Sequence, residues 1–181
     1  TVLRQKGDTD LALKNAKRLI NADYYVPELI HVPMEPPASA AHFHDGIFDI
    51  WACTQTPQSA QSNVAQATGV AAEKVNINVT LLGGGFGRKS KPDFVVEAAV
   101  LSKKLGMPIK VLWTREDDIK NGYYHAVSYQ KLSAGLDENN IVTAWKHTEA
   151  APTISSTFSK GADTIGLATS SGMIEIPVDS C

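Results

Sequence analysis

Four glycines fall within the five residues Gly83–Gly87, and the basic pair Arg88-Lys89 follows at once. An alternating stretch, Val75–Leu82, precedes them and is typical of a strand. Glycines this dense let the backbone adopt positive φ angles and approach another group closely, which residues with a Cβ rarely can. A helix is predicted just beyond, over Pro92–Leu105, with a proline near its start and a glycine past its end. Together these features favour a site for an oxygen-rich or anionic group.

Two common phosphate-binding motifs do not fit the glycine run. A P-loop needs glycine directly before its Lys-Ser/Thr pair, whereas here Arg88 precedes Lys89-Ser90. A dinucleotide fingerprint needs G-x-G-x-x-G, and counted from Gly83 or Gly85 its last position is not glycine. A loop that only turns tightly, and a nucleotide- or phosphate-binding module built on Gly83–Lys89, stay open as alternatives at this point.

The composition sets limits on function. The chain has 181 residues and a formal net charge of −2, which gives no electrostatic reason to expect a nucleic-acid partner or an anionic membrane. No apolar run approaches the roughly 20 residues of a membrane-spanning helix. The two cysteines, Cys53 and Cys181, make neither a disulfide framework nor a metal site.

Asp45-Gly46 is the strongest hairpin signal in the chain, because it stands between two apolar segments and suits a two-residue turn. In that register His42 faces Asp49 across the hairpin. His42 and His44 share a strand face, but only Asp49 is within reach as a third ligand. A histidine–carboxylate surface pair is therefore favoured over a metal site.

Capping residues, prolines and periodicity predict the other elements. We expect helices at Asp8–Ile20 and from Pro57 to Gly69 with Thr56 as N-cap, strands at Asp23–Val32, Ala40–His44, Ile47–Cys53 and Pro108–Thr114, a turn at Arg115–Asp118, an antiparallel pair at Ala126–Leu132 and Ile141–His147, a loop at Pro152–Gly172, and an interrupted strand at Met173–Cys181. That last stretch leads us to expect part of a longer protein. The predicted fold class is α+β: a mixed sheet with a β-loop-α-β unit and antiparallel hairpins, with helices packed on the sheet.

Several blocks of the chain resemble the large, molybdenum-binding subunit of the molybdenum hydroxylases, the xanthine oxidase and aldehyde oxidase family. The branch most similar includes isoquinoline 1-oxidoreductase β subunits and bacterial membrane-associated aldehyde dehydrogenases. A match of several blocks in order is more specific than a lone glycine motif. The blocks are His31–Pro36, Trp51–Gln58, Val79–Lys89, Asp93–Lys103 and Met107–Ile119. The resemblance implies that residues 1–20 are the tail of a preceding hammerhead-like domain, and that 21–181 begin a molybdopterin-binding domain truncated at its C-terminus.

The resemblance also implies a cofactor: a molybdopterin, in bacteria often in a cytosine dinucleotide form. In the family the glycine segment presents backbone N–H groups to oxo ligands of the metal. The contacts implied here come from Gly84, Gly85, Phe86, Gly87 and Arg88. No residue of the chain is expected to bind the metal directly. The implied reaction hydroxylates an aldehyde or N-heterocycle with oxygen from water, and electrons pass to iron–sulfur clusters on a small partner subunit, with a cytochrome c as one further acceptor.

The chain departs from relatives that hydroxylate purines. It has Leu29 where they place a glutamine near the molybdenum, Ser90 where they place a glutamate, and Tyr124-His125 near the position of an arginine that orients the substrate. Ser90 and His125 are therefore the expected substrate-side residues. The family's general-base glutamate lies far toward the C-terminus, so no catalytic residue is expected in this chain. A periplasmic or membrane-associated location is the expectation, and a non-catalytic subunit-interaction domain is the alternative to an enzyme.

Overall fold

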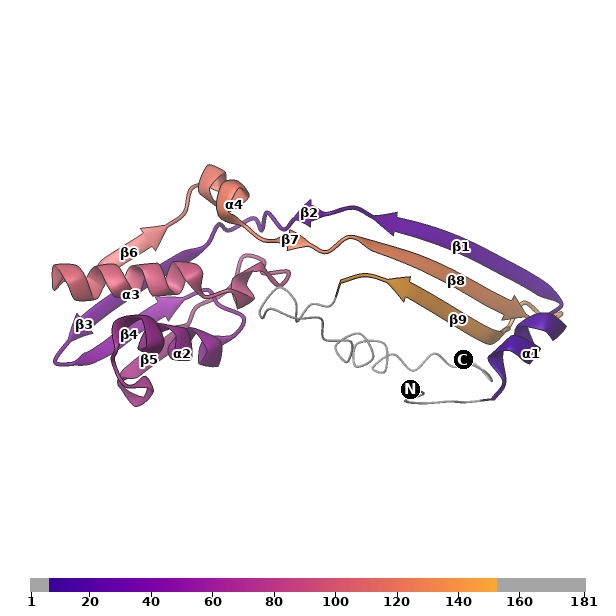
Figure 1. The fold of residues 1–181 in the computed structure, drawn as a ribbon, viewed down its shortest axis with the longest axis horizontal. Coiled ribbons are helices and arrows are strands. Elements are labelled where there is room, and N and C mark those ends of the chain that lie inside the picture. The colour runs from indigo at the N-terminus through magenta and orange to yellow at the C-terminus, as the bar shows by residue number, and fades with distance from the viewer. Residues whose placement is uncertain (1–6, 153–181) are drawn as a thin grey trace. The chain divides into compact units, whose positions relative to one another are not determined.

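The computed structural model describes residues 7–152 and divides into two units (Figure 1). The central unit is Ile30–Tyr124, and the terminal unit combines Thr1–Leu29 with His125–Cys181. Two short strands, β2 (Leu29–Ile30) and β7 (Tyr124–His125), form a two-stranded sheet. No helix in the described part of the chain is long and apolar enough to span a membrane.

The central unit is built on a four-stranded mixed sheet with the strand order β5-β4-β3-β6. The strands β3 and β4 form the predicted hairpin, with His42 opposite Asp49. Both turn residues, Asp45 and Gly46, have positive φ angles, 48° and 78°, as a two-residue hairpin turn of this type requires. The strands are β3 (Ala38–His44), β4 (Ile47–Ala52), β5 (Val75–Val79) and β6 (Ile109–Leu112).

Two helical crossovers connect parallel strands of this sheet. Helix α2 (Pro57–Thr68) joins β4 to β5, which pair in parallel. Helix α3 (Asp93–Leu105) joins β5 to β6, and β6 runs antiparallel to β3 at the opposite edge. The predicted β-loop-α-β unit therefore crosses the whole sheet, and the α+β fold class is confirmed.

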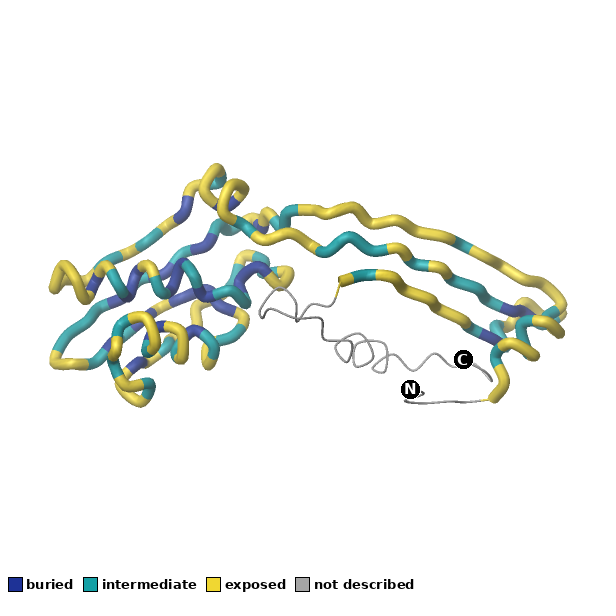
Figure 2. Tube along the Cα trace, viewed as in Figure 1, coloured by how far each residue is buried: buried dark blue, intermediate teal, exposed yellow. Residues whose placement is uncertain are grey.

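The hydrophobic core lies between the sheet and these two helices, where Figure 2 shows the buried residues of the central unit. Both helices end as predicted, at glycines in the left-handed conformation, Gly69 with φ 70° and Gly106 with φ 64°. The largest apolar side chains of the core are Phe48, Ile50, Val64, Val75, Phe94, Val95 and Trp113. Two single-turn 3₁₀ helices, η1 (Ala72–Lys74) and η2 (Arg88–Ser90), complete the unit.

The prediction at Arg115–Asp118 is wrong, because this segment begins helix α4 (Arg115–Asn121) instead of making a turn. The Thr114 hydroxyl accepts the N–H of Asp117 at 3.1 Å, and the Asp117 carboxylate accepts the N–H of Thr114 at 3.1 Å. This capping box satisfies two backbone donors at the helix start, and its T-x-x-D pattern was the overlooked signal.

The terminal unit contains a three-stranded antiparallel sheet in the order β1-β8-β9. The pair of β8 (Ser128–Leu136) and β9 (Val142–Ala150) was predicted, but its pairing with β1 (Arg18–Val26) was not. The first helix, α1 (Thr9–Asn15), has the expected Asp8 cap but ends earlier than predicted, since β1 takes the residues from Arg18 onward. Most residues of the three strands are exposed or half-buried (Figure 2).

Three sequence-based expectations stay predictions. The expected family boundary after residue 20 falls within β1, and the structure does not test it. The loop expected through Gly172 and the strand expected at Met173–Cys181 lie outside the described residues, the former from residue 153 onward.

Candidate functional site

The glycine loop, Gly83–Gly87, follows β5 and concentrates unusual backbone geometry. Gly84 and Gly87 have φ angles of 96° and 93°, and Phe86, a residue that is 65% exposed, has a φ of 53°. A positive φ is rare and costly for a residue with a bulky side chain. Strain of this kind persists where the surrounding structure fixes the backbone, so the loop's shape must be held from outside.

The other two glycines are required by close neighbours. A Cβ on Gly83 would lie 2.6 Å from the Cβ of Glu35, and a Cβ on Gly85 would lie 2.5 Å from Oε1 of Gln55. A methyl group at either position would force a neighbour to move: the backbone-bound Cβ of Glu35 in the first case, and the end of the Gln55 side chain in the second. Each glycine of the loop therefore has its own geometric reason, either a positive φ or a close approach.

The backbone donors of the loop fall into two sets. Oε2 of Glu35 accepts the N–H of Gly83, and Oε1 of Gln55 accepts the N–H of Gly87, each at 3.0 Å. Within residues 7–152, the N–H groups of the three residues between them, Gly84–Phe86, meet no acceptor. Three adjacent donors on a fixed, side-chain-poor backbone fit an oxo group or another oxygen-rich group, because fixed N–H donors can stabilise negative charge without reorganising.

Lys89 anchors the basic end of the loop from inside the protein. Its side chain is fully buried, and its Nζ lies 2.5 Å from Oε2 of Glu35, the atom that also accepts the N–H of Gly83. The main-chain N–H of Glu35 in turn donates to the carbonyl of Gly83 at 3.1 Å. Glu35 thus joins the two ends of the loop.

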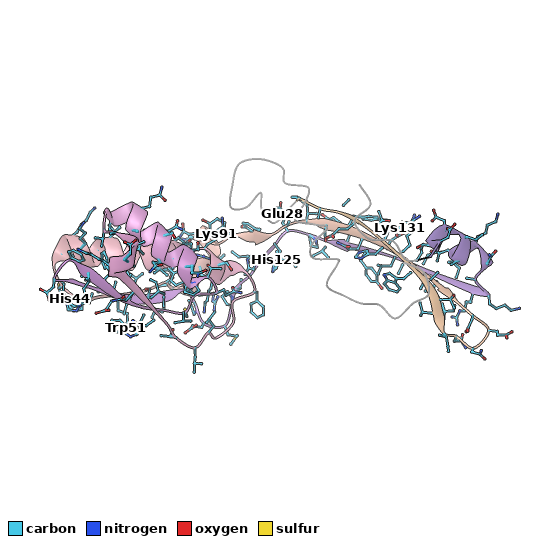
Figure 3. All side chains as sticks on the ribbon, turned by 90° about the horizontal axis from the view of Figure 1, so that it is seen from below. Glu28, His44, Trp51, Lys91, His125 and Lys131 are labelled. Carbon is cyan, nitrogen blue, oxygen red and sulfur yellow. The ribbon has the colours of Figure 1, made fainter. Side chains whose placement is uncertain are left out.

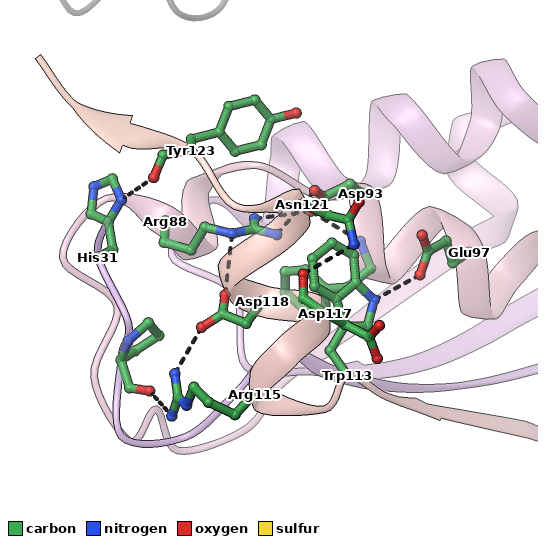
Figure 4. Close-up of polar contacts among 12 residues, drawn as sticks. His31, Arg88, Asp93, Glu97, Trp113, Arg115, Asp117, Asp118, Asn121 and Tyr123 are labelled. Atoms are coloured by element: carbon green, nitrogen blue, oxygen red, sulfur yellow. Dashed lines mark hydrogen bonds and ion pairs between the residues drawn. The ribbon is translucent and has the colours of Figure 1, made fainter. Parts of the chain in front are cut away.

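Arg88 is also turned inward, and Figure 4 shows its contacts. The guanidinium is 1% exposed and donates two hydrogen bonds of 3.0 Å to the carboxylate of Asp93. Its Nε lies 3.8 Å from Oδ1 of Asp118, and neither of these two atoms has a hydrogen-bond partner among the described residues. Asp118 accepts a 2.8 Å bond from Arg115, and the ring of Trp113 lies 5.0 Å from the guanidinium carbon.

The basic pair therefore serves to hold the loop. A phosphate-binding loop presents its lysine to the phosphate, whereas Lys89 is buried against Glu35. This arrangement disfavours the nucleotide- or phosphate-binding alternative. A cofactor contact from Arg88 stays a prediction. In the structure its guanidinium pairs with Asp93, and its main-chain N–H donates to the carbonyl of Gly85.

The expected substrate-side residues lie in different units. Ser90 ends η2 in the central unit, where its N–H donates to the carbonyl of Gly87 at 3.1 Å. His125 lies in β7 and belongs to the terminal unit, so a shared role with Ser90 stays a prediction. His31 lies beside the glycine loop: its Nδ1 is 2.8 Å from the carbonyl oxygen of Tyr123, and its Nε2 is 3.7 Å from the position of a Cβ on Gly87.

The hairpin carries the expected histidine–carboxylate pair, but the histidine that bonds to Asp49 is His44 and not His42. Nε2 of His44, which Figure 3 labels, lies 2.9 Å from the carboxylate of Asp49, although His42 is the residue directly opposite. The hydrogen bonds to Asp49 and then to Asp45 raise the pKa of His44. Among the described residues, no group of three His, Cys, Asp or Glu side chains is arranged to hold a metal ion.

The Glu35–Lys89 pair predicts a pH dependence of stability. Burial alone would raise the pKa of Glu35, but hydrogen bonds from Lys89 and from the Gly83 N–H outweigh it and hold the pKa below its ordinary value of 4.5. A carboxyl whose pKa is lowered on folding stabilises the folded state above its unfolded pKa, and this contribution is lost as the pH falls through the folded pKa.

We therefore expect Glu35→Gln to be less stable than the wild type at pH 7 and to approach it below about pH 4.5. Melting temperatures of the two proteins, measured from pH 3 to pH 7, test this. Other acidic groups with lowered pKa, such as Asp49 and Asp117, affect both proteins alike. A gap between the two melting curves that stays constant across this range would contradict the assigned role of the Glu35 carboxylate.

Comparison with known proteins agrees with this geometry. Residues 1–178 match the family described as the molybdopterin cofactor-binding domain. The chain is 37% identical over 121 residues to the isoquinoline 1-oxidoreductase subunit beta of Brevundimonas diminuta, an alignment covering 66% of this chain and 16% of that protein. It is 32% identical over 143 residues to the membrane-bound aldehyde dehydrogenase [pyrroloquinoline-quinone] of Gluconacetobacter polyoxogenes. That alignment covers 78% of this chain and 18% of that protein.

The fold is also similar to that of a solved protein, and at this low sequence identity the similarity concerns the fold alone. The aldehyde oxidoreductase from Desulfovibrio gigas superposes with a TM-score of 0.65 at 19% identity, covering 81% of this chain and 16% of that one. The chain thus spans less than a fifth of the length of these relatives. Because the family match covers nearly the whole chain, this protein belongs to the molybdopterin cofactor-binding domain family.

Proposed function

We propose that the glycine loop holds the molybdenum cofactor of an oxidoreductase that hydroxylates aldehydes or N-heterocycles with oxygen from water. The observation that carries this proposal is the set of three adjacent N–H groups, Gly84–Phe86, which lack an acceptor within the described residues and sit on a loop fixed at both ends. The cofactor, when bound, supplies the redox chemistry. The printed names of the relatives support the substrate class, since they refer to isoquinoline and to aldehyde.

The residues of this chain would bind and orient the group. Gly84, Gly85 and Phe86 would donate N–H groups to its oxygen atoms, and such fixed donors stabilise negative charge without having to reorganise. Glu35 and Gln55 hold the ends of the loop, and the ion pairs of Lys89 and Arg88 keep the following turn in place. We assign no general base within this chain.

A partner subunit carrying iron–sulfur clusters is part of this proposal, with a cytochrome c as one further acceptor. The relative from Brevundimonas diminuta is named as a subunit, which supports an assembly of more than one chain. One relative carries pyrroloquinoline quinone in its name, but the family description and the donor set of the loop favour molybdopterin. The cytosine dinucleotide form of the pterin belongs to the proposal as well.

The test uses the full-length protein purified with its partner subunits. We expect stoichiometric molybdenum and pterin, and a higher kcat/KM for an aromatic aldehyde or isoquinoline than for xanthine. Ser90 offers a single short hydroxyl where purine-hydroxylating relatives have a glutamate, and each unpaired buried polar group costs about 1–3 kcal/mol, or about 5- to 160-fold in kcat/KM.

The control is the same protein made in a host that cannot synthesise the cofactor, which should show no turnover. Absence of molybdenum and pterin from the protein of a competent host would rule out the proposed cofactor. Xanthine turnover as efficient as that of the best aldehyde or N-heterocycle would show that the substrate class is wrong.

A further inference from the structure

The segment Thr54–Thr56 lies along the end of the glycine loop and is bonded to it. The main-chain N–H of Gln55 and the hydroxyl of Thr54 both donate to the carbonyl of Lys89, each at 3.1 Å. The hydroxyl of Thr56 donates to the carbonyl of Ser90 at 3.0 Å instead of capping α2. This segment belongs to a sequence block that carries the family resemblance, Trp51–Gln58.

The Gln55 side chain contacts the glycine loop directly, at Gly85 and Gly87. Its Oε1 accepts the N–H of Gly87 at 3.0 Å, and the same oxygen occupies the space that a Cβ on Gly85 would need, at 2.5 Å. Gly85 has no positive φ, unlike its neighbours Gly84 and Gly87. The need for glycine at Gly85 therefore comes from Gln55 and not from the backbone conformation.

We propose that Gln55 is a positioning residue that sets the direction of the N–H groups of Gly85 and Phe86. The proposal rests on the proposed function of the loop. Glu35 fixes the loop at Gly83, and Gln55 fixes it at Gly87, so the donors between them have little freedom. A carboxamide suits this position because its oxygen accepts the Gly87 N–H without a negative charge, which would repel an oxygen-rich group at the loop.

Two substitutions separate the hydrogen bond from the charge. Gln55→Leu keeps a similar size without an acceptor, and Gln55→Glu keeps the acceptor and adds a charge. In full-length protein made without cofactor, we expect deuterium exchange at the Gly87 amide to become about fivefold faster in Gln55→Leu and to stay near the wild-type rate in Gln55→Glu. In protein made with cofactor, Gln55→Leu should lower kcat on the order of 100-fold with little change in KM, whereas Gln55→Glu should lower the molybdenum content.

A double-mutant cycle tests the link between Gln55 and Gly85. Gly85→Ala should displace the flexible end of Gln55 and so speed exchange at the Gly87 amide as Gln55→Leu does. In a Gln55→Ala background the added methyl meets no carboxamide, so Gly85→Ala should add little. Gly83→Ala is the matched control, because its methyl would meet Glu35 and its effect should be equal in both backgrounds.

Unchanged exchange at Gly87 in Gln55→Leu would overturn the inference, and so would equal effects of Gly85→Ala in the two backgrounds. Exchange and coupling are measured without cofactor, so they do not depend on the proposed function. If they come out as expected while the wild type from a competent host lacks molybdenum, the proposed function fails and Gln55 stands as the residue that holds the loop.

Discussion

Replacing Arg88 with methionine should lower the free energy of unfolding by about 3–5 kcal/mol, the range for removing one partner of a buried ion pair. The guanidinium is 1% exposed and makes two bonds to Asp93 and an ion pair with Asp118, whose side chain is also 1% exposed. Methionine fills much of the same space but leaves both carboxylates without this partner. Urea titration of the full-length protein, followed through the fluorescence of its tryptophans, measures the loss.

Two variants control this result. Arg115→Met removes a 31% exposed partner of Asp118 and should cost less, because solvent screens exposed ion pairs. Arg88→Lys keeps the charge but cannot donate two parallel bonds to Asp93, so it should recover only part of the loss. A change below about 1 kcal/mol for Arg88→Met would contradict this prediction and would mean that the two carboxylates find other partners.

The elements that could be predicted are those fixed by local sequence. The Asp45-Gly46 hairpin, with its positive φ angles, and helices α2 and α3, with their terminal glycines, need no information from distant segments. The terminal unit could not be predicted in the same way. Arg18 pairs with Leu136, and this distant partner converts the expected end of a helix into strand β1. Local helix propensity is overridden where pairing with a strand distant in the sequence supplies the backbone hydrogen bonds.

The glycine loop was visible in the sequence, but the residues that fix it were not. The basic pair Arg88-Lys89 supports the prediction of an anionic ligand, and a cofactor contact from Arg88 stays a prediction. In the structure both side chains form ion pairs with acidic residues. Asp93 is only five residues from Arg88, but Glu35 lies 54 residues from Lys89. Spacing alone does not reveal such a partner. Glu35 and Gln55 stand within blocks that carried the resemblance, and that was the one available hint of their importance.

Replacing Gly87 with valine should abolish turnover and cofactor content while the subunit stays folded. Gly87 has φ 93° and ψ −26°, a conformation that a β-branched residue strongly disfavours. The loop would have to change shape to relieve this strain, and the N–H groups of Gly84–Phe86 would be displaced. Molybdenum analysis and steady-state turnover of the full-length enzyme measure the effect, and circular dichroism establishes that the protein is folded.

Gly106→Val is the matched control for backbone strain. Gly106 also has a positive φ, 64°, at the end of α3, and a Cβ there meets nothing within 4 Å. Valine at Gly106 should lower stability by about 1–2 kcal/mol and leave turnover per molybdenum unchanged, because this glycine ends a helix and contacts no donor of the loop. If Gly87→Val retained normal turnover, or if both variants lost it equally, the glycine loop would be only a turn, since strain at Gly87 would then have no effect beyond that of strain elsewhere.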